Sequence, residues 1–233
     1  MSMGKMNLDL TIESKTGKND LACTVRRLVC AGWVGRDKEE LRAHVEELEK
    51  IGIPGPGKTP IHMNLSANLV TTADVVEVIS GETSGEVEFV FLKMGNEAYV
   101  GVGSDHTDRG FEKHSIPASK QMYPKVMSPV VWPYGEVKQH WDSLIIRSWM
   151  TLGGKKELYQ EDALAAILDV EAILDAMPSD DPLPGDGLVL FSGTVASKMG
   201  MVYGERFDFE MEDPILKRKN SHGYTVQVRR QHL

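Results

Sequence analysis

The sequence predicts one mostly β domain with a few short helices. Three observations carry this prediction. Residues 7–13 alternate polar and apolar side chains, the period typical of a strand with one buried face. Residues 86–103 form a Val- and Phe-rich stretch, a glycine-containing turn and an apolar return stretch, which indicates a hairpin. The pair at 153–154 is Gly-Gly between two further strand-like runs. With 233 residues, the chain is long enough to bury one substantial core.

The same patterns place the other strands in chain order. Each run is rich in apolar or β-branched residues and is bounded by glycine, proline or polar turn residues. The predicted strands are 7–13, 21–33, 61–65, 74–79, 86–92, 98–103, 142–152, 156–160, 188–191, 206–211 and 224–230.

Two segments favour helices. One helix is expected to start near Asp37, because this residue and the acidic residues after it suit a helix N-terminus. The other covers 161–177, where apolar residues recur at helical spacing until Pro178. Residues 110–140 contain four prolines and are expected to be irregular, and long loops of this kind tend to carry function.

Composition limits the classes of function. The net charge of -8 and the pI near 5.4 argue against nucleic acid as a partner, because backbone binding needs a basic surface. No apolar run is long enough for a membrane span and the N-terminus lacks a signal core, so we expect a cytoplasmic protein. Cys23 and Cys30 lie in apolar, strand-like sequence and are expected to be buried thiols rather than nucleophiles.

Three acidic residues form a candidate metal site. In a strand over 86–92, Glu86 and Glu88 point to the same face, and the return strand would bring Asp105 back beside them. Such a group of carboxylates is costly unless a hard cation such as Mg²⁺, Mn²⁺ or Ca²⁺ neutralises it. The alternative is an ordinary solvated acidic face of a strand.

His44 and Glu47 form a candidate base dyad. They are three residues apart on the first predicted helix, where a carboxylate can orient an imidazole and raise its basicity. The alternative is a surface histidine among the many charged residues of that helix.

The order of these motifs resembles the fumarylacetoacetate hydrolase superfamily. Glu86 and Glu88 match the Glu-x-Glu metal ligands of that family, and Asp105 matches its third ligand. The segment around Asp105 also keeps an arginine, Arg109, in place. Residues 183–194 contain Pro-Gly-Asp followed by Gly-Thr, which resembles a further signature of the family.

The resemblance implies roles for other residues. It implies Lys125 as the family's lysine, with Lys120 the less favoured candidate, and His44 with Glu47 as a water-activating pair. The implied substrate-binding residues are Arg109, Gly193 and Thr194.

For the whole chain the resemblance implies a rolled, barrel-like mixed β-sheet in a single domain over 1–233. Residues 1–60 would supply N-terminal strands and a lid-like helix, and 61–233 the β-rich catalytic core. The implied function is a Mg²⁺- or Mn²⁺-dependent hydrolase or lyase, acting on a small oxo-acid such as an acylpyruvate by carbon–carbon hydrolysis, decarboxylation or dehydration. The resemblance also favours a homodimer.

Two departures from the family pattern matter. The stretch between Glu88 and Asp105 is shorter than in typical members, and Val195 replaces a proline. We therefore expect a different substrate pocket and a divergent branch, one of the families of unknown function that share this fold. An alternative of another class is a binding or regulatory protein that keeps the fold and has lost turnover.

Overall fold

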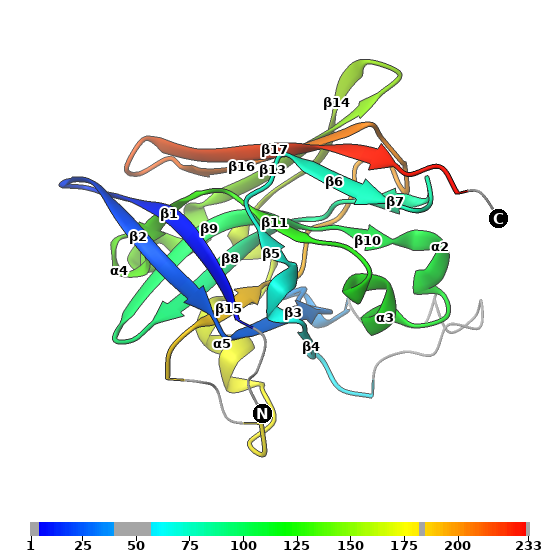
Figure 1. Cartoon of the computed structure of the whole chain (residues 1–233). Helices are drawn as coiled ribbons and strands as arrows, with labels where there is room; N and C mark the ends of the chain where they lie inside the picture. The colour runs from blue at the N-terminus through cyan, green and yellow to red at the C-terminus, as the bar shows by residue number, and fades with distance from the viewer. Residues whose placement is uncertain (1–4, 40–56, 182–184, 232–233) are drawn as a thin grey trace.

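The computed structural model describes residues 5–39, 57–181 and 185–231. The described chain is mostly β, as predicted, and its strands form a large curled sheet covered by a second sheet that runs across the top of Figure 1. The large sheet has the order β2 (Gly17–Val25), β1 (Met6–Ser14), β12 (Val130–Pro133), β9 (Glu97–Asp105), β8 (Val87–Met94), β15 (Leu188–Phe191), β3 (Arg27–Gly32) and β4 (Ile61–Leu65), while β11 (Lys125–Met127) pairs with β9 and with β5 (Val70–Thr71).

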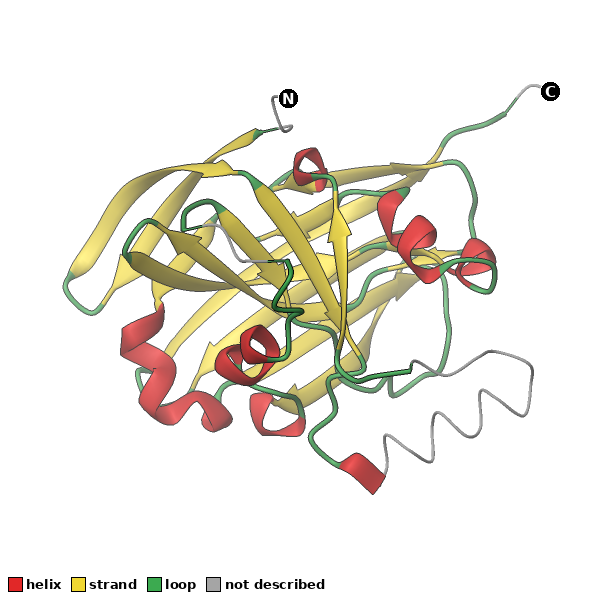
Figure 2. Cartoon of the chain, turned by 90° about the horizontal axis from the view of Figure 1, so that it is seen from below, coloured by secondary structure: helices red, strands yellow, loops and turns green. Residues whose placement is uncertain are grey.

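The second sheet and the short elements complete the fold. Its order is β14 (Lys155–Ala163), β13 (Ile145–Leu152), β16 (Arg206–Asp213), β17 (Arg218–Val228) and β6 (Val75–Val78). A two-stranded ladder joins β7 (Thr83–Ser84) to β10 (Thr107–Asp108). The described helices lie outside the sheets in Figure 2 and are α2 (Arg109–Glu112), α3 (Ile116–Gln121), α4 (Tyr134–Val137) and α5 (Val170–Asp175), with 3-10 turns at Ala67–Leu69, Lys138–Ser143 and Leu164–Ala166.

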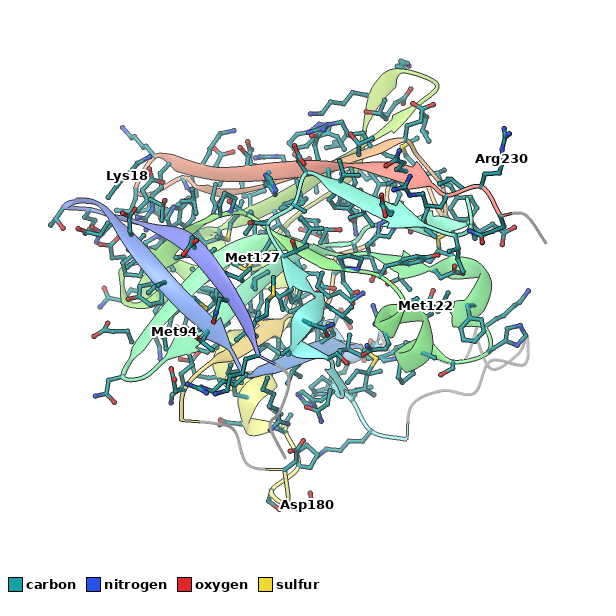
Figure 3. All side chains as sticks on the ribbon, in the orientation of Figure 1. Lys18, Met94, Met122, Met127, Asp180 and Arg230 are labelled. Carbon is teal, nitrogen blue, oxygen red and sulfur yellow. The ribbon has the colours of Figure 1, made fainter. Side chains whose placement is uncertain are left out.

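Strand β8 lies at the centre of the molecule and is buried on both faces. Phe89 and Phe91 belong to the apolar cluster between the two sheets. Val90 and Leu92 belong to a second apolar cluster inside the curl of the large sheet. The side chains of Figure 3 fill both spaces. A carboxylate in the buried part of β8, such as Glu88, therefore lies between apolar clusters and is costly without a partner.

The predicted hairpins are confirmed. β8 and β9 pair antiparallel around Gly95, whose φ of 60° suits a tight turn. β13 and β14 pair around Gly153 and Gly154, both with positive φ. The single strand predicted over 21–33 is wrong in one respect. The segment forms two strands, β2 and β3, which are separated at Arg26, and the backbone N–H of Arg26 donates to Gly187 O.

The helix predicted over 161–177 is wrong for most of its length. Residues up to Ala163 continue β14, because Ala163 pairs with Ile145 on β13. The helix α5 begins only after Asp169, whose side chain accepts from Ala172 N. The apolar spacing came from buried residues of a strand end, a 3-10 turn and a short helix, and cross-strand pairing overrode local helix propensity.

Residues 110–140 are more regular than predicted. They contain most of α2, the short helices α3 and α4, and the strands β11 and β12, and both strands pair with β9. Pro133 lies at the N-cap of α4, a position that a proline tolerates. Pro117 lies in the first turn of α3, so these prolines suit the starts of helices and do not make the segment a loop.

The predicted helix start near Asp37 agrees with the part of the chain that is described. Helical conformation begins at Lys38, and Asp37 Oδ1 accepts from Glu39 N at 2.8 Å. His44 and Glu47 lie outside the described residues. Within the described ranges, no helix has the length and apolar character that crossing a membrane requires.

Candidate metal centre

The β8–β9 hairpin brings the three predicted carboxylates together. Glu88 pairs with Gly103 in the ladder, and just beyond its end Asp105 N donates to Glu86 O at 3.1 Å. One carboxylate oxygen from each of Glu86, Glu88 and Asp105 lies within 4.8 Å of the other two. Glu88 and Asp105 are fully buried, whereas the Glu86 side chain is 22% exposed. The cluster therefore meets solvent on the side of Glu86.

Glu88 is the carboxylate with the fewest partners. Its Oε2 accepts from Gly193 N at 2.9 Å, and its buried Oε1 has no hydrogen-bond partner. Burial, together with the nearby Asp105, raises the pKa of Glu88 well above its ordinary value. A buried acceptor without a donor is costly, so this oxygen has a vacant coordination direction that a cation would satisfy.

Asp105 is held by two lysines. Lys120 Nζ lies 2.5 Å from Oδ2, and Lys125 Nζ lies 2.8 Å from Oδ1. Lys125 sits directly opposite Asp105 in the β9–β11 ladder and also donates to His106 O at 2.6 Å. Burial would raise the pKa of Asp105, but the two ammonium groups outweigh it and hold that pKa below its usual range.

Lys120 also reaches Glu86, with Nζ 3.2 Å from Oε2. It comes from the last turn of α3, and its side chain is 7% exposed, whereas the Lys125 side chain is fully buried. Both lysines thus contact the cluster, and the lysine that the sequence placed second is the one that bridges two of the carboxylates. The assignment of Lys125 as the catalytic lysine stays a prediction.

Arg109 clamps Glu86 from the other side. Its Nη2 lies 3.0 Å from Glu86 Oε1, its Nε donates to Ser84 Oγ at 2.7 Å, and its Nη1 pairs with Glu112. Burial raises the pKa of Glu86, but Arg109 and Lys120 together lower it below its usual value. These contacts engage every nitrogen of the guanidinium, so in this conformation Arg109 positions Glu86. Its predicted role in binding substrate is untested.

Gln160 connects the loop after β15 to the start of β8. Val87 N donates to Gln160 Oε1 at 3.0 Å, and Gln160 Nε2 donates to Thr194 Oγ1 at 2.8 Å. Thr194 Oγ1 in turn donates to Val87 O at 2.6 Å. Gly193 and Thr194 therefore lie beside Glu88 and help to hold the carboxylate-bearing strand. Whether they contact a substrate stays a prediction.

A second polar group lies on the opposite face of β9, and the sequence analysis missed it. Tyr224 Oη lies 2.9 Å from Ser104 Oγ and 2.8 Å from His106 Nδ1. Burial, helped by Lys125 and Arg109, lowers the pKa of His106 to about 3. The signal was the strand period, since the residues on either side of Asp105 must point away from the carboxylates.

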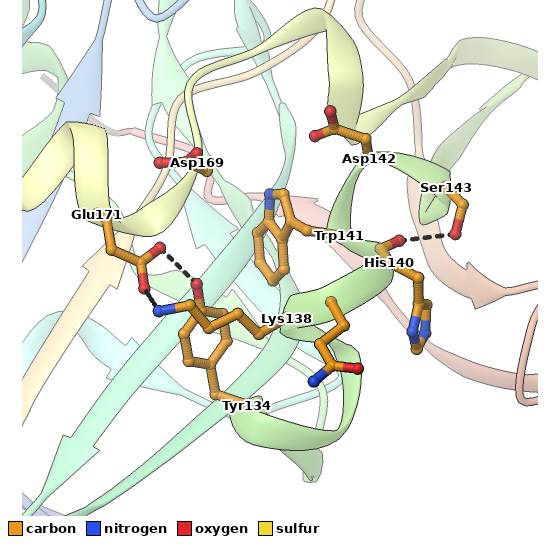
Figure 4. A pocket seen from close by; sticks show the side chains of 9 residues that line it. Tyr134, Lys138, His140, Trp141, Asp142, Ser143, Asp169 and Glu171 are labelled. Atoms are coloured by element: carbon orange, nitrogen blue, oxygen red, sulfur yellow. Dashed lines mark hydrogen bonds and ion pairs between the residues drawn. The ribbon is translucent and has the colours of Figure 1, made fainter.

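A surface hollow of about 450 Å³ lies elsewhere, beside α4 and α5. Its lining residues include Tyr134, Lys138, Trp141 and Glu171 (Figure 4). Tyr134 Oη donates to Glu171 at 2.6 Å. None of the three clustered carboxylates lines it. Lys138 and Glu171 pair with each other and Asp142 pairs with Arg36, so the buried cluster, with its unpartnered oxygen, is the stronger candidate site.

The carboxylate cluster fits a hard divalent cation. Carboxylate oxygens are the ligands that Mg²⁺, Mn²⁺ and Ca²⁺ prefer, and three of them converge here from two adjacent strands. The unpartnered Glu88 Oε1 is an independent sign that the cluster is incomplete as protein alone.

The fold is that of the fumarylacetoacetate hydrolase superfamily, as the resemblance predicted. Three solved structures illustrate the similarity. A putative fumarylacetoacetate hydrolase family protein from Yersinia pestis CO92 is 16% identical, with a TM-score of 0.61, covering 93% of this chain and 99% of that one. A 2-keto-3-deoxy-D-arabinonate dehydratase complexed with magnesium and 2,5-dioxopentanoate is 18% identical, with a TM-score of 0.60 and coverage of 88% and 74%. The 4-oxalocrotonate decarboxylase from Pseudomonas putida G7, complexed with calcium and acetate, is 14% identical, with a TM-score of 0.55 and coverage of 85% and 76%.

The chain belongs to the family described as protein of unknown function DUF2848, whose model matches residues 31–224. The expected assignment to a family of unknown function is confirmed. No curated protein matches the sequence.

Proposed function

We propose that this protein is a divalent-metal-dependent hydrolase or lyase that acts on a small oxo-acid. The observation that carries the proposal is the buried triad of Glu86, Glu88 and Asp105, in which one carboxylate oxygen has no partner within the protein. The similar structures support it, because one is a dehydratase with magnesium and a dioxo-acid and another is a decarboxylase with calcium.

The triad would hold Mg²⁺ or Mn²⁺, which supplies Lewis acidity to the carbonyl or enolate oxygen of the substrate. The protein's own residues prepare that position. Gly193 N fixes Glu88 through Oε2 and leaves its Oε1 without a partner, while Lys125 fixes Asp105 through Oδ1 and the more exposed Lys120 holds Oδ2. Lys120, on the solvent side, supplies positive charge where an anionic substrate enters.

His44 and Glu47 separate the two reaction classes. Hydrolysis needs a base that deprotonates water, a role the pair would fill, whereas decarboxylation and dehydration need mainly the metal and a proton donor. His44→Ala should therefore lower hydrolytic turnover by about 100-fold or more while leaving metal affinity unchanged. Steady-state kinetics and a metal titration on the same preparation measure both quantities, and a variant as active as the parent would remove the pair from the mechanism.

The metal site is tested by thermal melting with and without cation. Millimolar Mg²⁺ or Mn²⁺ should raise the melting temperature of the parent protein, because a ligand of the folded state stabilises it by mass action, and a chelator should reverse the effect. Glu88→Gln is the sharpest variant, since the amide still accepts from Gly193 N while the ligand charge is lost.

Glu88→Gln should abolish the response to metal and leave the metal-free protein at least as stable, because within the described residues Glu88 forms no ion pair. Glu97→Gln, an exposed position on the same hairpin, is the matched control and should respond as the parent does. If no divalent cation changes the melting temperature of the parent protein, the assignment of the metal site is wrong.

Turnover is tested with a panel of acylpyruvates and related oxo-acids in the presence of metal. Loss of the enol ultraviolet absorbance reports carbon–carbon cleavage or decarboxylation. If the protein binds metal at the triad and turns over none of the panel, the binding or regulatory alternative replaces the enzyme proposal.

A further inference from the structure

Both oxygens of Asp105 are already occupied by ammonium groups. Lys120 Nζ pairs with Oδ2 at 2.5 Å, and Lys125 Nζ pairs with Oδ1 at 2.8 Å. Lys120 bridges onward to Glu86 Oε2 at 3.2 Å. One ammonium thus lies between two of the three carboxylates that form the candidate metal site.

Two carboxylates of the cluster already have cationic partners without a metal. Asp105 pairs with the ammonium groups of both lysines, and Glu86 pairs with Lys120 and with Arg109, which lies 3.0 Å from Glu86 and also pairs with Glu112. A divalent cation bound to the same oxygens would stand close to Lys120 in a dry environment, where repulsion between like charges is only weakly screened. Cation and ammonium therefore compete for the same two carboxylates.

The two lysines differ in their freedom to move away. Lys125 is on a strand whose backbone pairs with β9, its side chain is fully buried, and it has a second acceptor in His106 O. Lys120 lies in the last turn of α3, a short helix outside the sheets in Figure 1, and its neighbours Gln121 and Met122 are exposed. Its long, flexible stem lets the charged end swing toward solvent once a cation neutralises the two carboxylates.

We propose that Lys120 is an internal counter-ion that exchanges with the divalent cation. This inference rests on the proposed function of the triad and adds an order of events to it. In the metal-free protein, the Lys120 ammonium neutralises Glu86 and Asp105 and so reduces the repulsion between these carboxylates. When the cation binds, the Lys120 ammonium leaves the carboxylates and moves to the solvent side of the site, where it meets the carboxylate of an incoming oxo-acid.

The first test is the affinity for Mn²⁺, measured by calorimetry on the whole protein. Lys120→Met keeps the length of the side chain and removes the competing charge, so Mn²⁺ should bind about 10-fold more tightly or better than to the parent. Lys113→Met, at an exposed position just before α3, is the control and should leave the affinity unchanged. Equal or weaker binding by Lys120→Met, with the parent binding Mn²⁺, would overturn the exchange.

The second test needs no variant and so holds even if Lys120→Met fails to fold. Reductive methylation of the parent protein, read by peptide mass spectrometry, reports how accessible each lysine is. Saturating Mn²⁺ should increase modification of Lys120 several-fold, with Lys125 protected and Lys113 reactive in both states. Lys120 that stays equally protected while Mn²⁺ binds contradicts the exchange alone. A parent protein and a Lys120→Met variant that both fail to bind Mn²⁺ would overturn the exchange together with the metal site.

Discussion

The residues of the cluster differ in how completely the protein satisfies them. Asp105 accepts from a buried lysine at each oxygen, and Glu86 is held between Arg109 and Lys120. Glu88 has a backbone donor at one oxygen and no partner at the other. The unequal support predicts that substitutions at these charged positions have opposite effects on the stability of the metal-free protein.

Removing Lys125 should be severe. Lys125→Met leaves Asp105 buried with one of its two partners missing, and breaking a buried ion pair from one side typically costs about 3–5 kcal/mol. Urea denaturation of the metal-free protein measures the change in the free energy of unfolding. Lys138→Met is the comparison, because Lys138 pairs with Glu171 on the surface, where such pairs are worth about 1 kcal/mol or less. Similar small losses in both variants would show that the Lys125–Asp105 pair contributes little.

His106 should make the protein sensitive to mild acid. The imidazole is buried and neutral, and its pKa falls from an ordinary 6.5 to about 3 on folding. Between these pH values His106 is protonated in the unfolded chain and neutral in the folded protein. Its contribution to the free energy of unfolding is therefore fully present above pH 6.5 and is lost as the pH falls toward 3. This one group should remove about 2 kcal/mol of stability between pH 7 and pH 5.

His106→Gln tests this contribution, because the amide can still face Tyr224 Oη and does not titrate. Denaturant unfolding at pH 7 and pH 5 should show a smaller acid loss in the variant than in the parent. The same loss in both proteins would assign the acid sensitivity to other groups.

At the scale of the elements, the backbone just before β8 packs closely against three side chains at Gly85. A Cβ at this position would lie 2.5 Å from Ser104 Oγ, 2.6 Å from Tyr224 Oη and 2.8 Å from Phe207 Cδ1. Gly85→Ala should therefore destabilise the protein by about 1–3 kcal/mol through overpacking. Gly81→Ala, before β7, meets no atom within 4 Å and is the matched control. Thermal melting of the two variants compares them directly, and equal melting temperatures would show that the three side chains yield without cost.

Elements formed by local sequence were predictable, and those set by distant partners were not. The 86–103 hairpin shows both strand periods and a glycine turn within one window, and its geometry alone brings Asp105 to Glu86. Residues 161–163 look helical in isolation and become strand because β13 offers them partners. The lysines illustrate the same limit, since a helix end and a strand deliver Lys120 and Lys125 to one carboxylate, and no local pattern reveals that convergence.

For the molecule as a whole, distant segments close the two sheets against each other. Trp132 Nε1 donates to Glu13 at 3.1 Å, and the Arg218 guanidinium stacks 4.4 Å above the Trp132 ring. Arg218 also pairs with Glu136 at 2.9 Å. The first strand, the middle of the chain and the last strand thus meet at one corner, which only the tertiary structure reveals.

Strand β15 also sets when the site can form during synthesis. It lies between β8 and β3, antiparallel to one and parallel to the other, and the chain just after it provides the amide that holds Glu88. As the protein leaves the ribosome, Glu86, Glu88 and Asp105 emerge long before this strand does. Until it arrives, β8 presents an open apolar edge of the kind that recruits chaperones or other nascent chains. The hairpin that carries the three carboxylates is therefore synthesised early and completed late, because it waits for Gly193.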